Sequence, residues 1–271
     1  MNLTKQLEAA GPFDIDGDIE EAKASWVAFR VANGYKAEAR PLLGSPESNR
    51  KLSKLSGMTL ANYGLSLLPA DASGIDVCTW RTPLCTKACV LSTAGNAGYP
   101  SVRKGRAVKT QFLAAHPDHF VVLLAEEIRQ AAEQHPGGVA VRLNVASDIR
   151  WERVAPRLFE LPVTFYDYTK APASQRDDMG GRYHLTFSVS ERPRSEVEAV
   201  EWLSRGGSAA VVFDVKPGHE LPATWKGFQV IDADVQDGRY TDPKSTVAGL
   251  RAKGAGRGGK AAGFVKEAIA T

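Results

Sequence analysis

Residues 119–147 read HFVVLLAEEIRQAAEQHPGGVAVRLNVAS, and this stretch decides the fold class. Its first part, 119–135, has the apolar spacing of an amphipathic helix, which Pro136 and the two glycines after it bring to an end. Its last part, 139–147, is a short apolar run of the kind that forms a buried strand. A helix followed directly by a buried strand is the repeating unit of an α/β fold with a parallel sheet.

The same alternation continues on both sides of this stretch. Residues 61–69, ANYGLSLLP, predict a strand before it, and residues 195–207 predict a later helix that ends at two glycines. Six strand–helix units are too few for a closed eight-unit barrel. We therefore expect an α/β fold built as a partial (β/α)6 TIM-like barrel with mostly parallel strands, and a flat doubly wound sheet is the alternative. The remaining strands are predicted at 162–169, 183–190, 209–215 and 228–235.

The expected organisation is a single domain with additions at both ends. Residues 1–58 form an N-terminal lead-in or cap, in which EEAKASWVAFRVANGY (20–35) predicts a helix that Gly34 ends. Residues 59–250 form the barrel. Residues 251–271 are rich in glycine and basic residues and are expected to form a C-terminal tail.

Composition restricts the class of protein. The chain has 271 residues, of which 43% are hydrophobic, so one sizeable core is expected. Its first residues are polar and acidic without the apolar region of a signal peptide, and no run of 18 apolar residues predicts a membrane span. The net charge of +3 permits contact with nucleic acid without requiring it. We expect a cytoplasmic protein with reduced cysteines.

All three cysteines of the chain fall within the stretch DVCTWRTPLCTKACV, residues 76–90. Their spacing is Cys-x6-Cys-x3-Cys, so Cys85 and Cys89 fit one face of a helix, whereas the longer gap from Cys78 requires a loop. Three converging thiolates are ligands for a soft metal centre. The cysteine cluster is therefore the main candidate site.

Three interpretations of the cluster are open. A [4Fe-4S] cluster takes up to four thiolates, so three cysteines would leave one iron open for a small ligand, and we favour this interpretation. Structural zinc requires four ligands, and neither a fourth cysteine nor a nearby histidine is present. In the third interpretation the cysteines bind no metal and are small buried apolar residues.

A cysteine triad after the first strand of a six-unit barrel resembles the radical S-adenosylmethionine (SAM) superfamily. The resemblance implies that Cys78, Cys85 and Cys89 hold a [4Fe-4S] cluster, that SAM chelates the open iron, and that its reductive cleavage gives a 5'-deoxyadenosyl radical. The superfamily's usual spacing is the narrower Cys-x3-Cys-x2-Cys, and its Gly-Gly-Glu stretch is replaced here by RLNVASDIRWE. We lean towards a radical-SAM-like enzyme on this basis.

Longer motifs resemble a three-cysteine family of small proteins encoded by phages of actinobacteria and by some plasmids. Besides the cysteines, they are AGNAGYPSVRKGRAVKT, VRLNVASDIRWE, VTFYDYTK, YHLTFSVSE and LRAKG, and they extend over most of residues 60–253. The resemblance implies a viral protein that works in the cytoplasm of a bacterial host cell. The resemblance also implies that the three cysteines act together.

Polar residues near the strand ends are candidates for contact with a cofactor or ligand. Arg142 and Asn144 alternate with apolar neighbours and would face a barrel interior, where Asp148 or Glu191 would pair with the arginine. Tyr166 and Lys170 share one side of the next strand. The alternatives are a structural ion pair for the arginine and ordinary packing for the tyrosine. The candidate cofactor-binding residues are Arg142, Asn144, Asp148, Tyr166, Lys170 and Glu191.

Two basic segments suggest a different class of function. A strip within residues 94–112 and the C-terminal tail would bind host protein or nucleic acid, although solvated surfaces would have the same composition. The competing hypothesis is thus a non-enzymatic, metal-stabilised binding protein. The basic residues are Arg103, Lys104, Arg106 and Lys109 in the strip and Arg251, Lys253, Arg257, Lys260 and Lys266 in the tail.

Overall fold

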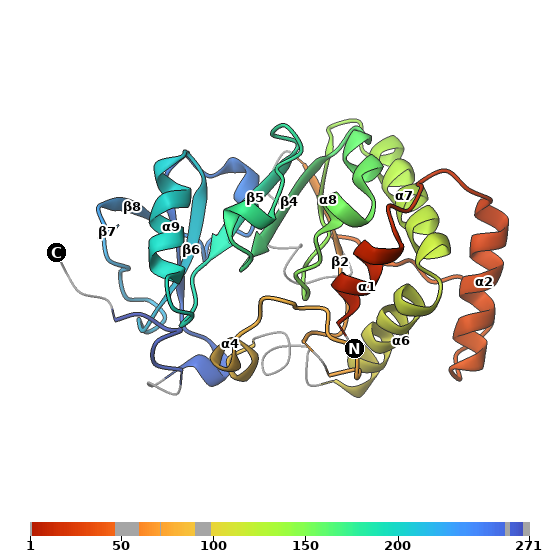
Figure 1. The fold of residues 1–271 in the computed structure, drawn as a ribbon, viewed down its shortest axis with the longest axis horizontal. Helices are drawn as coiled ribbons and strands as arrows, with labels where there is room; N and C mark the ends of the chain where they lie inside the picture. The colour runs from red at the N-terminus through yellow and green to blue at the C-terminus, as the bar shows by residue number, and fades with distance from the viewer. Residues whose placement is uncertain (1, 47–59, 71, 90–98, 258–260, 268–271) are drawn as a thin grey trace. The chain divides into compact units, whose positions relative to one another are not determined.

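A computed structural model of the chain has an α/β fold with nine strands in one mostly parallel sheet that is not closed (Figure 1). The strand order is β1-β2-β3-β4-β5-β6-β9-β8-β7. The structure describes residues 2–46, 60–70, 72–89, 99–257 and 261–267.

The elements have the following bounds. The strands are β1 (Leu43–Gly44), β2 (Ala61–Leu65), β3 (Val139–Arg142), β4 (Thr164–Thr169), β5 (Tyr183–Ser188), β6 (Ser208–Phe213), β7 (Thr224–Trp225), β8 (Phe228–Asp232) and β9 (Val247–Arg251). The α-helices are α1 (Leu3–Ala10), α2 (Ile19–Ala32), α4 (Pro83–Lys87), α6 (Pro100–Ala115), α7 (Pro117–Gln134), α8 (Trp151–Val154) and α9 (Ser195–Ser204). Short 3-10 turns are η2 (Pro156–Glu160), η3 (Ala173–Gln175), η4 (Arg239–Thr241) and η5 (Gly254–Gly256).

All six predicted strands are present as β2, β3, β4, β5, β6 and β8, and the predicted helices are α2, α7 and α9. The α/β class and the mostly parallel sheet are therefore confirmed. Six successive barrel units would place β8 beside β6, but β9 lies between these two strands and is parallel to both. The strand β9 and the helix α6 were not predicted.

The chain divides into two compact units, each assembled from segments that are distant in sequence. The first unit comprises Met1–Thr79, Pro100–Phe165 and Asp178–Tyr183. The second unit comprises Trp80–Tyr99, Tyr166–Asp177 and His184–Thr271. The helices α1 and α2 of the expected lead-in thus belong to the same unit as β2 and β3.

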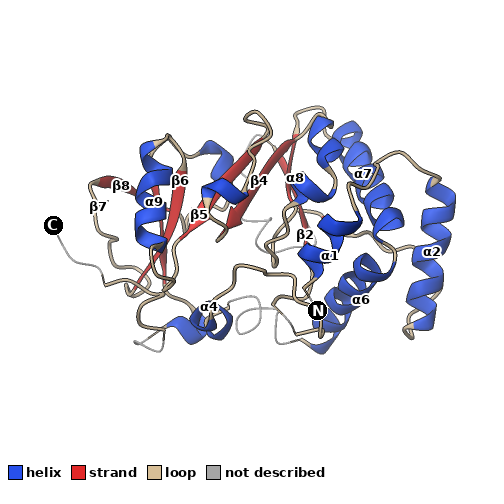
Figure 2. Ribbon diagram, in the orientation of Figure 1, coloured by secondary structure: helices blue, strands red, loops and turns tan. Residues whose placement is uncertain are grey.

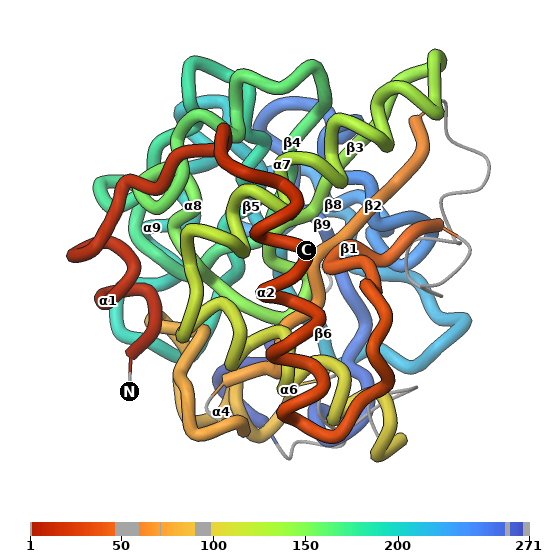
Figure 3. The backbone as a smooth tube through the Cα atoms, turned by 90° about the vertical axis from the view of Figure 1, so that its right-hand side faces the viewer, coloured from red at the N-terminus to blue at the C-terminus, as the bar shows by residue number. Residues whose placement is uncertain are grey.

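In the first unit, helices α2, α6 and α7 pack together (Figure 3). Asp18 caps α2 by accepting hydrogen bonds from the backbone N–H groups of its first turn, and Trp26 is buried on the inner face of that helix. The Trp26 ring lies 4.8 Å from the Phe112 ring of α6, which in turn lies 6.1 Å from Phe120 of α7. Offset aromatic contacts of this kind join the three helices.

Two charged side chains fix the edge strand β1 to these helices. The carboxylate of Glu127, on α7, accepts hydrogen bonds from the backbone N–H groups of Leu42 and Leu43, each at 2.8 Å. Nζ of Lys109, on α6, donates to the carbonyl of Leu42 at 2.7 Å. Burial lowers the pKa of Lys109 to about 8 and raises the pKa of Glu127. We call Glu127 and Lys109 the β1 clamp.

In the second unit, α9 packs on the sheet beside β6 (Figure 2). The core here includes Phe187, Leu203 and Val211, and the half-buried Trp202 packs against it with its ring 5.9 Å from that of Phe187. The chain turns tightly after α9, and a Cβ on Gly207 would lie only 2.1 Å from Cδ1 of Trp202. Glycine is therefore required at this close approach.

The C-terminal residues are folded into the second unit. Arg251 ends β9, and its guanidinium forms ion pairs with Asp232 at 2.8 Å and Asp234 at 3.2 Å. The backbone of Lys266 pairs with β6, since its N–H donates to the carbonyl of Val212 at 2.8 Å. The expected tail thus begins at the last residue of β9 and contains a segment bound to the sheet.

Candidate functional site

Cys85 lies on α4, a five-residue helix of the second unit whose first turn is fixed by side chains. Thr82 is the N-cap, and its Oγ1 accepts from the backbone N–H of Cys85 at 3.2 Å. Both oxygens of Glu191, which follows β5, are used here: Oε2 accepts from Thr82 Oγ1 at 2.7 Å, and Oε1 accepts from the N–H of Leu84 at 2.8 Å. The sequence Thr82-Pro83 is a typical helix start, because proline suits the first helical position.

The other two cysteines lie at different places in the chain's two units. Cys89 follows α4 in the second unit, and its N–H donates to the carbonyl of Thr86 at 3.3 Å. Cys78 belongs to the first unit, where its thiol donates to the carbonyl of Ala146 at 3.7 Å and its N–H donates to Asp76 at 2.9 Å. None of the three cysteines is in a disulfide, and all three are half-buried. The metal-free interpretation predicts that the cysteines are fully buried, as small core residues are. The observed exposure of the cysteines differs from this prediction.

The described residues form no site for a single metal ion. Within the described ranges, no group of three or more His, Cys, Asp or Glu side chains is arranged to hold a metal ion. A single ion draws all its ligands to about 2.3 Å or less from one point, whereas an iron–sulfur cluster binds each thiolate at a different iron. A single ion therefore requires the cysteine sulfurs to meet at one point, whereas a cluster requires each sulfur to reach a different iron.

In the first unit, Arg142, Asn144 and Asp148 are buried, and for Arg142 and Asn144 this agrees with their alternation with apolar neighbours. The strand β3 ends at Arg142, so Asn144 and Asp148 lie in the loop after it. The Asn144 amide is engaged by its own loop: Oδ1 accepts from Ser147 Oγ at 2.8 Å and from the N–H of Ile149 at 2.9 Å, and Nδ2 donates to the carbonyl of Ile149 at 2.9 Å. These bonds close the turn after β3. Asn144 thus fixes the loop that carries Ala146, the hydrogen-bond acceptor of Cys78.

In the second unit, the remaining candidates lie near the C-terminal residues. Tyr166 is fully buried, and its ring meets that of Tyr240 edge-on at 5.1 Å. Nζ of Lys170 donates to Ser188 Oγ at 3.0 Å and lies 5.6 Å from the ring centre of Phe264. Phe264 was not predicted as a site residue, because no sequence signal links the end of the chain to β4.

The basic strip and the tail differ in how their charges are placed. Arg103 and Lys104 are exposed on α6, with Lys104 Nζ 4.9 Å from the ring centre of Tyr35, whereas Lys109 is committed to the β1 clamp. In the tail, Lys253 bonds to Asp234 and Lys266 to Glu196. Lys260 lies outside the described residues. Exposed positive charge is therefore present both at the start of α6 and in the tail, where Lys253 and Arg257 are exposed.

Comparisons with known proteins place the chain in a family. Within the described residues, none of the helices has both the length and the apolar character that crossing a bilayer requires. No curated protein and no solved structure matches the chain. The model of the family described as gene product 88, a phage-type family, matches residues 37–268, which include all three cysteines. The chain therefore belongs to the gene product 88 family.

Proposed function

We propose that this protein is a phage-encoded iron–sulfur protein in which Cys78, Cys85 and Cys89 bind a [4Fe-4S] cluster. The observation that supports the proposal most is the state of the cysteines, which form no disulfide, are half-buried and fall within twelve positions of the sequence. Cysteines used only for packing are usually among the most buried residues. Reduced, accessible thiols are the chemical form that metal binding requires.

The donor set fits a cluster better than it fits zinc. Three thiolates leave one iron of a [4Fe-4S] cluster without a protein ligand, and a small molecule in the host cytoplasm would bind there. Zinc would require a fourth protein ligand, for which the sequence offers no cysteine. When bound, the cluster supplies one-electron chemistry. The proposal includes a partial (β/α)6 barrel arrangement, with SAM as the candidate ligand.

The protein's own residues would prepare the cysteines for binding. The Cys78 thiol donates a hydrogen bond to the carbonyl of Ala146, and the thiol proton must leave before the sulfur binds iron. The loop carrying Ala146 is fixed by Asn144, and α4 is fixed by Thr82 and Glu191. Lys170 places a positive charge in the same unit as α4, where it would attract an anionic ligand group.

The first test is the absorption spectrum, with iron and sulfide counts, of protein purified without oxygen. We expect a brown protein with a broad visible band and about four irons and four sulfides per chain. Cys85→Ala should lose the band and most of the iron, whereas Lys87→Ala, an exposed change on the same helix, should retain both. A colourless protein with stoichiometric zinc, or with no metal, would refute the iron–sulfur proposal.

A second candidate function is the binding of nucleic acid through α6. The observation that favours it is charge: the sixteen residues of α6 include no acidic residue, and Arg103 and Lys104 are exposed. Each phosphate contact contributes about −0.9 to the slope of log affinity against log salt. Replacing both residues by alanine should therefore reduce the magnitude of that slope by about two. Affinity that does not change with salt would contradict this function.

A further inference from the structure

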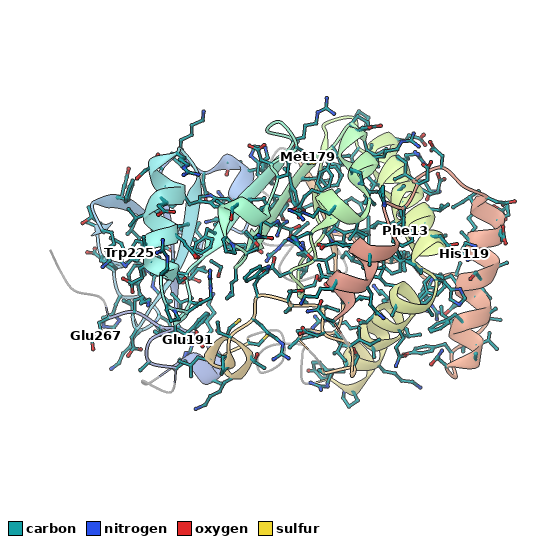
Figure 4. The ribbon with its side chains drawn as sticks, viewed as in Figure 1. Phe13, His119, Met179, Glu191, Trp225 and Glu267 are labelled. Atoms are coloured by element: carbon teal, nitrogen blue, oxygen red, sulfur yellow. The ribbon has the colours of Figure 1, made fainter. Side chains whose placement is uncertain are left out.

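We infer that Glu191 is a positioning residue that sets the place of Cys85 by holding α4, and that it does not contact the ligand itself. The inference rests on the proposed function, since it concerns a cysteine that would bind the cluster. Figure 4 labels Glu191 beside α4 in the second unit. The argument depends only on contacts within that unit.

The helix α4 is too short to be stable by itself. Helices far shorter than about twelve residues are unstable in water, because nucleation fixes several residues for one hydrogen bond. The first N–H groups of a helix also lack partners within the helix. In α4 these groups are satisfied from outside: the N–H of Leu84 donates to Glu191, and the N–H of Cys85 donates to Thr82.

Glu191 and Thr82 form a chain of two hydrogen bonds, called the relay here, that ends at the backbone of Cys85. The Thr82 hydroxyl donates to Glu191 Oε2 at 2.7 Å and at the same time accepts from the Cys85 N–H at 3.2 Å. A hydroxyl can do both, because it carries one donor and two lone pairs. A carboxylate at the start of a helix also interacts favourably with the helix dipole. Two hydrogen bonds therefore connect Glu191 to the backbone of Cys85.

The end of α4 is held by the C-terminal segment, defined here as residues 252–257 and 261–266, whose residues 254–256 form η5 (Figure 1). Ala88, which follows α4, packs with Ala252, Ala261 and Val265. A Cβ on Gly263 would lie 3.4 Å from Cβ of Glu191, so this segment also packs against Glu191 itself. The helix is thus fixed at its start by a charged hydrogen-bond acceptor and at its end by small apolar residues.

Both oxygens of Glu191 are therefore engaged with the start of α4. With both oxygens bonded there, the carboxylate acts on the helix that carries Cys85. We expect the loss of the carboxylate to free the first turn of α4 and to move Cys85. The loss of a charged hydrogen-bond partner of this kind corresponds to roughly a 10- to 100-fold increase in local opening.

The test uses the full chain, purified without oxygen, as wild type, Glu191→Ala and Glu201→Gln. Glu201 is an exposed control residue on α9. In metal-free protein, hydrogen exchange at Leu84 and Cys85 should become at least about tenfold faster in Glu191→Ala and should not change in the control. Alkylation of Cys85 should be faster by a similar factor. After reconstitution with iron and sulfide, this variant should also release iron at least several times faster than wild type.

A second pair of variants covers the possibility that Glu191→Ala does not fold. Thr82→Val removes the relay hydroxyl without changing the side chain's shape, and Thr82→Ser keeps the hydroxyl. We expect Thr82→Val to accelerate exchange at Cys85 and Thr82→Ser to restore the wild-type rate.

The outcomes separate this inference from the proposed function. Unchanged hydrogen exchange at Leu84 and Cys85 in both Glu191→Ala and Thr82→Val would overturn the inference that Glu191 positions Cys85. So would faster exchange in Glu191→Ala with no change in iron release from the reconstituted protein. If wild type binds no iron but exchange still accelerates, the proposed function fails and the positioning of Cys85 by Glu191 is supported.

Discussion

Replacing Glu127 by alanine is expected to lower the free energy of unfolding by about 3 kcal/mol. The substitution removes the acceptor of two backbone hydrogen bonds, those of Leu42 and Leu43. It also leaves the Lys109 ammonium of the β1 clamp without its opposite charge in a partly buried place. An unsatisfied buried donor costs about 1–3 kcal/mol, so the two N–H groups alone account for most of the loss.

Chemical denaturation of wild type, Glu127→Ala and Glu126→Ala measures this loss. Glu126 is the preceding residue on α7, and its Oε1 accepts a hydrogen bond from the exposed Gln130 side chain. Its removal should change stability by less than about 0.5 kcal/mol. Equal losses in the two variants would show that the β1 clamp does not stabilise the first unit.

Replacing Gly207 by alanine is expected to cost about 3 kcal/mol. The added Cβ would lie 2.1 Å from one ring atom of Trp202 and 2.2 Å from another, so the indole must leave its position. The ring is rigid and packs on the core of the second unit, and the carbonyl of Trp202 is only 3.0 Å from the new atom. Either the packing of Trp202 or the turn after α9 must therefore change.

The matched control is Gly105→Ala, the same substitution in the middle of α6. No atom lies within 4 Å of the Cβ position there, and alanine is the better helix former. This variant should be more stable than wild type by roughly 0.5–1 kcal/mol. Thermal or denaturant unfolding, with Trp fluorescence as the signal, compares the two. A Gly207→Ala variant as stable as wild type would contradict the close packing of Trp202 in the second unit.

The missed strand shows where local sequence patterns are insufficient. The run VAGLR of β9 contains a glycine, which weakens a strand signal. In the structure Gly249 lies where a Cβ would be 2.6 Å from Cγ1 of Val230, so the glycine permits β9 to fit beside β8. Gly249 weakens the strand signal in the sequence, and the sheet nevertheless requires a glycine at this position.

The candidate residues illustrate a second limit of sequence reasoning. The burial of Arg142 and Asn144 followed from their alternation with apolar neighbours. The partners of Glu191 did not, because they lie more than a hundred positions away in the chain. Sequence spacing indicates which residues share a strand face, but contacts such as Lys170 with Phe264 depend on how the end of the chain returns to the sheet.

The position of β9 has a consequence for biosynthesis. This strand is made after β8 but lies between β6 and β8, so neither neighbour has its final pairing until residue 251 has left the ribosome. At about 5–20 residues per second, the interval after Phe213 lasts roughly 2–8 s. During that time the nascent chain exposes an open strand edge, which is a surface through which unfinished chains can aggregate.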